Sequence, residues 1–522
     1  MVEAAARGSG PRGRRLAGLL LALVAAYLPV ALFVAGHEGA LYDDAFIYFR
    51  YADNLRAGCG FAFNCGHAPV EGFTSGLYLA LLTALHAAGM PLVDAATSLG
   101  QLGAWGAALL AAALAPRLLH GLDERLRWAA AAATLAVLGS DGVWLLNAVT
   151  GLETAVAASL CTLVALAMVR LRQGGGSGRG LGWTIWLAWL ARPEAAVFGP
   201  AALLWPAGRT GDADRTRSNR EVATRILVTL ALLVAAVLAA RWTIFGDWVA
   251  NTARAKSGGS AAHVALGWAY LQEAAVDFPL LALAPLGALS ARIRGLAGPF
   301  LVAAGVWSLA TLLTGGDHFA YSRMLAPLVP ACTAISVAMV AIALARAIRS
   351  APPVLAVAGL LATFAAFAAH TTTRHAVPDL HAFPNVKRWL LVGAWLRDQR
   401  PGARIATVPI GAIGWVSGAQ LIDLVGLTEP AIARHGRALP PERLTRSWIG
   451  HERERTDWVL AEAPDLLVFT RSSTVPFTLA TARAGFWAEW LLLQEIKTGR
   501  ARYRIADAEV APGLHWLVFE RF

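Results

Sequence analysis

Apolar runs of about 20 residues recur along the chain, and this feature constrains its fold more than any other. A run of that length is what one α-helix needs to cross the hydrocarbon core of a bilayer. Hydrophobic residues make up 57% of the 522 residues and charged residues only 15%. Soluble globular proteins contain about 25% charged residues, so the composition predicts a polytopic α-helical membrane protein.

We expect about eleven crossings on the span-length criterion. A further apolar segment, 73–89, is short and is expected to dip into the membrane without crossing it. Basic residues before the first run, including Arg12, Arg14 and Arg15, place the N-terminus in the cytoplasm and predict an uncleaved signal anchor. The expected spans are 16–36, 98–116, 128–146, 152–168, 181–191, 194–206, 226–245, 277–291, 295–314, 324–345 and 353–369.

This orientation keeps the basic loops 117–127, 169–180, 208–225, 292–294 and 346–352 in the cytoplasm, as the positive-inside rule requires. Because the number of crossings is odd, everything after the last span lies outside. The spans on either side of Arg192-Pro193-Glu194 are too short to cross comfortably, which suggests broken helices that line a polar cavity.

Composition changes at about residue 370, where charged residues and prolines become frequent. We therefore predict a transmembrane domain over 1–369 and a soluble extracytoplasmic α/β domain over 370–522. The segments ARIATVP, LIDLVG, DLLVF and HWLVFERF read as short buried strands. VKRWLLVGAWLRDQ and PERLTRSWIGHERERTDWVLAE have helical character.

The segment 43–76 follows the first span directly and is rich in polar side chains. Charge beside lipid is costly, so such a cluster at a membrane face indicates a functional site. In the expected topology the polar loops 147–153, 192–194, 245–259 and 315–323 share its face. The segment is expected to form an outer loop, and it holds Asp43, Asp44, Arg50, Asn54, Arg56 and Glu71.

A transferase at the outer face would need a lipid-linked donor, because nucleotide-activated donors are absent there. It would need a carboxylate near the reacting carbon, cations for a phosphate leaving group and a groove for the lipid tail. Asp43 and Asp44 are the candidate carboxylates, as general base or electrostatic stabiliser. The candidate phosphate ligands are Arg192, Arg254, Lys256, His318 and Arg323.

Each candidate also has a plain structural interpretation. Adjacent acids often mark a solvated loop edge, Arg192 could snorkel to the membrane surface, and Glu153 could cap a helix. Asp247 and Asn251 could form turns, and His318 could be a surface imidazole. Their common location on one face favours a shared site. The motifs of nucleotide hydrolases, zinc proteases and serine hydrolases are absent. The charge of +11 is carried almost wholly by arginines, which cluster in the loops between spans and set the orientation, so no nucleic-acid partner is expected.

The segment DDAFIYFRYADNLRAGCGFAFNCGHAPVEGFTS resembles the first outer loop of GT-C glycosyltransferases, DDxxIxxRYxxNLxxGxGxxFN followed by VEGxT. The similarity is closest to the mycobacterial terminal β-(1→2)-arabinofuranosyltransferase family. It continues, in chain order, through TGLET, ARPEA, GDWVANTARAK, GGDHFAYSRMLAPLVP and IGAIGWVSGAQLIDLVGLTEPAIA, so it covers roughly residues 40–435. Ala250 stands where the family has proline, and Cys59 and Cys65 replace residues usually of the His or Pro type.

The resemblance implies a GT-C enzyme of the bacterial cytoplasmic membrane that transfers a sugar from a polyprenyl phosphate, best guessed as arabinofuranose on decaprenyl phosphate. The acceptor would be a cell-envelope glycan or a protein such as a pilin. Asp43 would be the principal catalytic carboxylate with Asp44 beside it, and no cofactor is certain, although a divalent cation is possible. The implied substrate-binding residues are Arg50, Tyr51, Asn54, Asn64, Glu71, Glu153, Arg192, Glu194, Asn251, Lys256, Asp317, His318 and Arg323.

Three alternatives stay open. Within enzymes, the runner-up is a transferase of another sugar, for example mannose or aminoarabinose, onto lipid or protein. A flippase or transporter of lipid-linked sugars is the rival function, and it would predict an internal repeat and charges at the bilayer midplane. Cys59 and Cys65 lie six residues apart and could form a disulfide if their loop faces an oxidising compartment, or they could remain free thiols.

Overall fold

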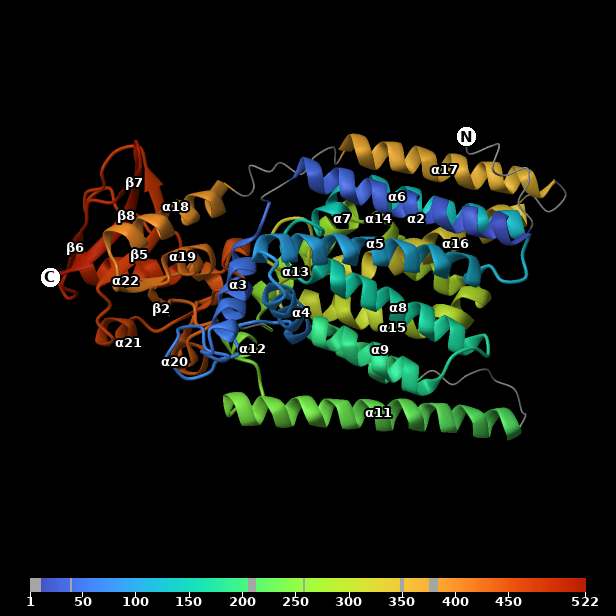
Figure 1. Cartoon of the computed structure of the whole chain (residues 1–522), viewed down its shortest axis with the longest axis horizontal. Helices are drawn as coiled ribbons and strands as arrows, with labels where there is room; N and C mark the ends of the chain where they lie inside the picture. The colour runs from blue at the N-terminus through green and yellow to red at the C-terminus, as the bar shows by residue number, and fades with distance from the viewer. Residues whose placement is uncertain (1–10, 38–39, 205–212, 257–258, 348–351, 375–383) are drawn as a thin grey trace.

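A bundle of long helices with an α/β region at one end makes up the computed structural model of the chain (Figure 1). The structure describes residues 11–37, 40–204, 213–256, 259–347, 352–374 and 384–522. The polar connections at 43–76, 147–153, 245–256 and 315–325 lie at the end of the bundle that faces the α/β region. The described parts of the basic connections lie at the other end, which is the segregation expected from the sequence.

Helices occupy all eleven ranges expected to cross the membrane. Five stretches are long and apolar enough to cross by themselves, counted over the described residues: Leu92–Leu118, Thr154–Arg172, Arg220–Phe245, Ala291–Leu313 and Ala326–Ala347. The chain is thus a polytopic membrane protein, and the number of crossings stays a prediction. The helices are α2 (Pro11–Gly36), α5 (Leu92–Leu118), α6 (Glu124–Ser140), α7 (Gly142–Leu146), α8 (Thr154–Arg172), α9 (Gly178–Ala191), η1 (Pro193–Val197), α10 (Phe198–Leu204), α11 (Ala213–Phe245), α13 (Ala261–Asp277), α14 (Pro279–Leu283), η2 (Ala284–Leu289), α15 (Ala291–Leu313), η3 (Ala326–Leu328), α16 (Val329–Ala347) and α17 (Pro353–Arg374).

Small residues let the central helices approach closely, as is usual for helices packed in membranes. A Cβ atom on Gly100 of α5 would lie 2.2 Å from the Ala148 carbonyl oxygen. One on Gly103 would lie 2.6 Å from the backbone of Ala155 in α8. By contrast, α11 stands at the side of the bundle, and its exposed Leu227, Leu232 and Trp242 suit contact with lipid.

The segment that begins at Asp43 was expected to be a loop, and this expectation is wrong. Residues Asp43–Arg56 form helix α3, which lies between the bundle and the α/β region (Figure 1). Its two acids occupy the first turn and Arg56 the last, which suits the helix dipole, and Phe46 and Phe49 are buried. A loop follows, and then α4 (Gly76–Ala87), whose 12 residues are too short for a span. Cys59 and Cys65 form a disulfide in that loop.

The C-terminal region is built on a six-stranded mixed sheet of order β2-β1-β5-β8-β6, with β7 also paired to β8. All four segments predicted as strands contain one. The segment predicted as a helix over 386–399 lies within α18, whereas 441–462 is largely irregular, with a helix only at Thr456–Ala461 and Gly450 at a positive φ of 82° between the short turns. The elements are α18 (Pro384–Gln399), β1 (Arg404–Thr407), α19 (Ile410–Ser417), β2 (Gln420–Asp423), α20 (Pro430–His435), β3 (Arg437–Ala438), β4 (Arg453–Glu454), α21 (Thr456–Ala461), β5 (Leu466–Ser473), α22 (Trp487–Lys497), β6 (Tyr503–Ile505), β7 (Glu509–Ala511) and β8 (Leu514–Arg521).

One face of this sheet shares its core with the helical bundle. Along β5, Leu466 and Val468 belong to the cluster that continues into the bundle, whereas Leu467 and Phe469 belong to a second cluster on the other face. This alternation is what a strand covered on both faces requires. The proposed boundary at 369/370 falls inside α17, which extends to Arg374, and the connection 375–383 lies outside the described residues.

Candidate functional site

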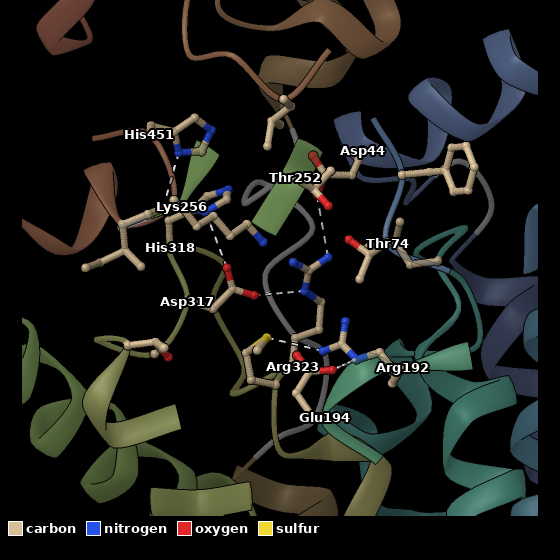
Figure 2. A pocket seen from close by; sticks show the side chains of 18 of the residues that line it. Asp44, Thr74, Arg192, Glu194, Thr252, Lys256, Asp317, His318, Arg323 and His451 are labelled. Atoms are coloured by element: carbon tan, nitrogen blue, oxygen red, sulfur yellow. Dashed lines mark hydrogen bonds and ion pairs between the residues drawn. The ribbon is translucent and has the colours of Figure 1, made fainter. Parts of the chain in front are cut away.

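A cavity of about 230 Å³ lies where the end of the bundle meets the C-terminal region. Its walls come from α3 and the loop after it, from the segment just before α8, from the break after α9, and from α12 (Asn251–Ala255) with the residue that follows it. The end of α15 with the loop after it, Leu427 and the segment 449–452 complete the walls. Figure 2 shows its charged side chains directed towards a common space. The charged and imidazole side chains that line it are Asp44, Glu153, Arg192, Glu194, Lys256, Asp317, His318, Arg323, His451 and Glu452.

The two adjacent acids at the start of α3 have different surroundings. Successive side chains on a helix diverge by about 100°, so the two carboxyl groups point in different directions. Asp44 lines the cavity, whereas Asp43 faces α19 and accepts hydrogen bonds from the backbone N–H groups of Gly411 (3.0 Å) and Ala412 (2.7 Å). We expected a cavity containing Asp43, and the structure places Asp44 there instead.

Burial raises the pKa of both carboxyl groups. For Asp43 it raises the pKa to about 7, against the opposing effect of the Ala412 N–H. For Asp44 burial is again the largest cause, and the nearby positive charges of Arg323 and Lys256 oppose it. Asp44 is therefore a carboxylate whose charge depends on cations in the same cavity.

Arg323 lies at the centre of one ion-pair network. Its Nε is 2.9 Å from the Asp317 carboxylate and its Nη1 is 3.8 Å from that of Asp44. Burial tends to raise the pKa of Asp317, but Arg323 and His318 outweigh it and hold the pKa well below its usual range. The backbone before Arg323 is unusual, because Tyr321 and Ser322 have φ angles of 65° and 47°.

Arg192 forms a second network at the break between α9 and η1, which confirms the interrupted helix expected around Pro193. Its Nη1 donates to Glu153 at 2.7 Å, and its Nε is 3.6 Å from Glu194. Tyr48 of α3 donates a hydrogen bond to Glu153 as well, at 3.4 Å. Glu153 is thus a buried partner of Arg192, more than a helix cap.

Lys256 follows α12 and lines the cavity, where Figure 2 shows its side chain directed inwards. Within the described parts of the chain its ammonium group forms no hydrogen bond or ion pair. Arg254, two residues earlier, does not line the cavity. It pairs with Asp247 at 2.7 Å, so the structure separates these two predicted phosphate ligands.

His318 and His451 meet edge to face, with ring centroids 4.5 Å apart. Burial, then the nearby His451, lowers the pKa of His318 to about 3, and burial likewise lowers the pKa of His451. Both imidazoles are therefore neutral at pH 7. His318 was predicted as a phosphate ligand, and this stays a prediction: its Nδ1 lies 3.3 Å from the Asp317 carboxylate, and as a neutral imidazole it donates a hydrogen bond without adding positive charge.

Other residues predicted to bind substrate lie outside the cavity and hold its walls in place. Arg50 is buried and donates to the carbonyl groups of Phe63, Gly414 and Ala419 and to Asn64. Tyr51 donates to Val70 O, and Asn54 donates to Ala62 O and Phe63 O. Asn64 and Asn251 reach the C-terminal region, where Asn64 donates to Leu421 O and Asn251 to Gly426 O and Leu427 O. Glu71 pairs with Arg241 at 2.6 Å.

The sequence analysis missed the part of the cavity that comes from the C-terminal region. His451 and Glu452 line it together with Ile449 and Gly450. Their segment was interpreted as helix, and no local motif identifies it. The GHE tripeptide offers the only signal, a glycine next to two side chains able to exchange protons. No group of three or more His, Cys, Asp or Glu residues suited to a metal ion occurs among the described residues.

Solved structures with the same architecture include ArnT from Cupriavidus metallidurans. In its apo state it aligns at 12% identity over 98% of both chains with a TM-score of 0.53, and bound to undecaprenyl phosphate at 12% identity over 98% of both chains with a TM-score of 0.52. The apo oligosaccharyltransferase of Archaeoglobus fulgidus aligns at 14% identity over 77% of this chain and 64% of that chain, with a TM-score of 0.50. The chain thus has the GT-C fold.

Sequence comparisons are less informative. Residues 382–511 match a family model described as a domain of unknown function, DUF8728. No curated protein matches the chain significantly. The membership of the GT-C fold expected from the motifs is confirmed, and the narrower resemblance to the mycobacterial arabinofuranosyltransferases is not.

The different surroundings of the two acids predict different effects on stability. Each Asp43 oxygen accepts one backbone N–H of α19, whereas asparagine has a single acceptor oxygen. Asp43→Asn therefore places an NH2 group against one of these N–H groups, and we expect a loss of about 1–3 kcal/mol in the free energy of unfolding. Asp44→Asn faces the cavity and should change stability less. Thermal unfolding in detergent measures both, and equal melting temperatures for the two variants would contradict the assignment of Asp43 to α19.

Proposed function

We propose that this protein is a membrane glycosyltransferase that moves a sugar from a polyprenyl phosphate to a hydroxyl group of a cell-envelope glycan or protein. The observation that carries the proposal is the convergence of Arg192, Lys256 and Arg323 on one cavity with Asp44. These residues come from separate elements of the chain, so their meeting is a property of the fold. ArnT of C. metallidurans, which has the same fold, has been crystallised with undecaprenyl phosphate.

The cations suit a leaving phosphate. When the bond between the anomeric carbon and the phosphate oxygen breaks, negative charge is left on the phosphate beside the low-dielectric bundle, where an unpaired anion is costly. Arg192 and Arg323 are held by carboxylates, so they add fixed hydrogen-bond donors but little net charge. Lys256 is the cation in the described cavity without an ion-pair partner, and it supplies the balancing charge.

Asp44 suits the opposite charge. A glycosyl group develops positive charge at its anomeric carbon and ring oxygen as the bond to the leaving group breaks. A carboxylate on the wall of the cavity stabilises that charge, because its negative charge is already in position before the bond breaks. Arg323 lies 3.8 Å from Asp44, which leaves the carboxylate loosely tethered and open to the cavity.

The sugar we propose is arabinofuranose carried on decaprenyl phosphate, and the support is the series of motifs shared with the arabinofuranosyltransferases. We propose further that residues 1–369 form the membrane domain and that 370–522 lie outside the cytoplasm with the active site. The Cys59–Cys65 disulfide supports this side, because disulfides persist in oxidising compartments.

Lipid-phosphate binding tests the role of the cations. Lys256→Gln removes the free ammonium group, and one charge-assisted contact is worth about 1.5–3 kcal/mol, so undecaprenyl phosphate should bind roughly 10- to 100-fold more weakly. Arg254→Gln is the matched control, since Arg254 lies on the same short segment but pairs with Asp247 outside the cavity. Titration of both purified variants in detergent measures the difference; equal affinities would overturn the phosphate site.

Transfer activity tests Asp44. Asp44→Asn keeps the shape of the side chain and removes its charge, so we expect release of polyprenyl phosphate from a labelled lipid-linked sugar to fall by roughly 100-fold or more. Asp43→Asn, corrected for the fraction of folded protein, should retain more activity. If Asp43→Asn were inactive while fully folded and Asp44→Asn remained active, the catalytic carboxylate would be Asp43.

Membrane topology tests the orientation. With the N-terminus in the cytoplasm and an odd number of crossings, a reporter fused after Phe522 lies outside. Alkaline phosphatase at this position should be active and green fluorescent protein dark in Escherichia coli. The reverse pattern would place both the C-terminal region and the cavity on the cytoplasmic side, where a lipid-linked donor is no longer required.

A further inference from the structure

Glu452 differs from the other acids of the cavity. The four others each pair with Arg192 or Arg323. Glu452 forms no ion pair with an arginine or lysine in the described parts of the chain. Its charge is therefore not used to hold a fixed cation.

The carboxyl group of Glu452 is nevertheless held firmly. Its side chain is only 2% exposed, and Oε1 accepts a hydrogen bond from the Gly450 N–H at 2.8 Å. His263 Nε2 lies 3.6 Å from the same oxygen, and Ser260 Oγ lies 2.6 Å from the other ring nitrogen of His263. The Gly450 N–H thus orients one carboxylate oxygen, and His263 of α13 lies close to the same oxygen but beyond hydrogen-bond distance.

The second carboxylate oxygen of Glu452, Oε2, has different surroundings from the first. Oε2 is buried and has no hydrogen-bond partner among the described residues. A buried carboxylate oxygen without a partner costs free energy, and in native proteins such a group usually has a functional explanation. Because Glu452 lines the cavity, a hydroxyl group bound there could donate to Oε2.

Its location separates Glu452 from the leaving group. The wall 449–452 comes from the C-terminal region, and Figure 2 shows His451 across the cavity from Arg192. A phosphate bound by Arg192 and Arg323 would lie on the side of the bundle, with the sugar between it and this wall. The acceptor hydroxyl, which must approach the anomeric carbon from outside the donor, then meets Glu452.

We propose that Glu452 is the proton acceptor for the attacking hydroxyl group, an assignment that rests on the glycosyl transfer proposed above. The acceptor oxygen forms the new bond to the anomeric carbon as the bond from that carbon to the phosphate oxygen breaks. The hydroxyl proton moves to Oε2 of Glu452, and the polyprenyl phosphate leaves with the electron pair.

The test is Glu452→Gln, which keeps the size of the side chain and removes its ability to take a proton. Release of decaprenyl phosphate is measured from a decaprenyl-phosphoryl pentose, with an alkyl glycoside as the hydroxyl acceptor. We expect turnover to fall by about 100-fold or more, whereas the affinity for undecaprenyl phosphate stays within threefold of wild type. Glu452→Asp retains a carboxylate one methylene group shorter and should recover part of the rate.

Glu454→Gln is the matched control. Glu454 is equally buried, with 2% of its side chain exposed, but it pairs with Arg437 and does not line the cavity, so turnover per folded molecule should be unchanged. Turnover of Glu452→Gln within threefold of wild type would falsify the proposal, and so would an equal loss of undecaprenyl phosphate binding. If Glu452→Gln does not fold, a Glu452→Asp variant with full activity or with lost lipid-phosphate binding overturns it equally.

The proposed function fails in a different way. If wild-type protein binds no polyprenyl phosphate and releases none from any lipid-linked sugar, glycosyl transfer itself is wrong. If wild-type protein turns over the donor and the Glu452 variants do so at the wild-type rate, glycosyl transfer stands and the proton acceptor is another group.

Discussion

Two polar side chains of α3, Asp43 and Arg50, join the C-terminal region to the membrane bundle, and the cavity depends on them. Asp43 accepts hydrogen bonds from the start of α19, and Arg50, two turns later, donates to carbonyl groups at the end of α19 and in the loop after α3. Buried charges are tolerated only when their hydrogen bonds are satisfied, so these contacts require one relative position of α3 and α19. A side chain at Gly411 would collide with the Asp43 carbonyl at 2.0 Å, which shows how close the two elements lie. With α3 held in this way, Asp44 faces the cavity.

The cavity gathers more acids than cations, and this balance has a chemical consequence. Arg192 and Arg323 are each held by two carboxylates, so they keep their geometry when no ligand is bound. A site of this kind offers oriented donors to a phosphate without the self-repulsion of a purely basic cluster. Two further groups come from different parts of the cavity wall. Lys256 supplies the free positive charge, and Glu452 supplies a carboxylate oxygen without a partner among the described residues. A reaction that separates charge between a leaving phosphate and an attacking hydroxyl needs groups of both kinds.

The parts of the fold that follow from local patterns were predictable. The eleven ranges predicted from span length are helical, although α13 (Ala261–Asp277) was not among them, and short apolar runs identified β1, β2, β5 and β8. The helix α3 was missed because its charged residues suggested a solvated loop, whereas its aromatic residues pack against the C-terminal region, for instance Phe46 with Trp415 at 5.4 Å. The segment 441–462 was predicted to have helical character, but residues 449–452 follow an irregular path and line the cavity.

The sequence alone determined that the chain is a membrane protein, which loops gather at one end of it, and which polar residues are candidates for a site. These conclusions rest on the length of the apolar runs and on the distribution of charge between loops, which are local properties of the sequence. It could not decide between Asp43 and Asp44, which are chemically identical and adjacent. That choice rests on the direction in which α19 approaches α3. Nor could it assign His451 and Glu452 to the cavity, since more than 400 residues separate Glu452 from Asp44 along the chain. Only the packing of the C-terminal sheet on the end of the bundle brings these side chains to one space.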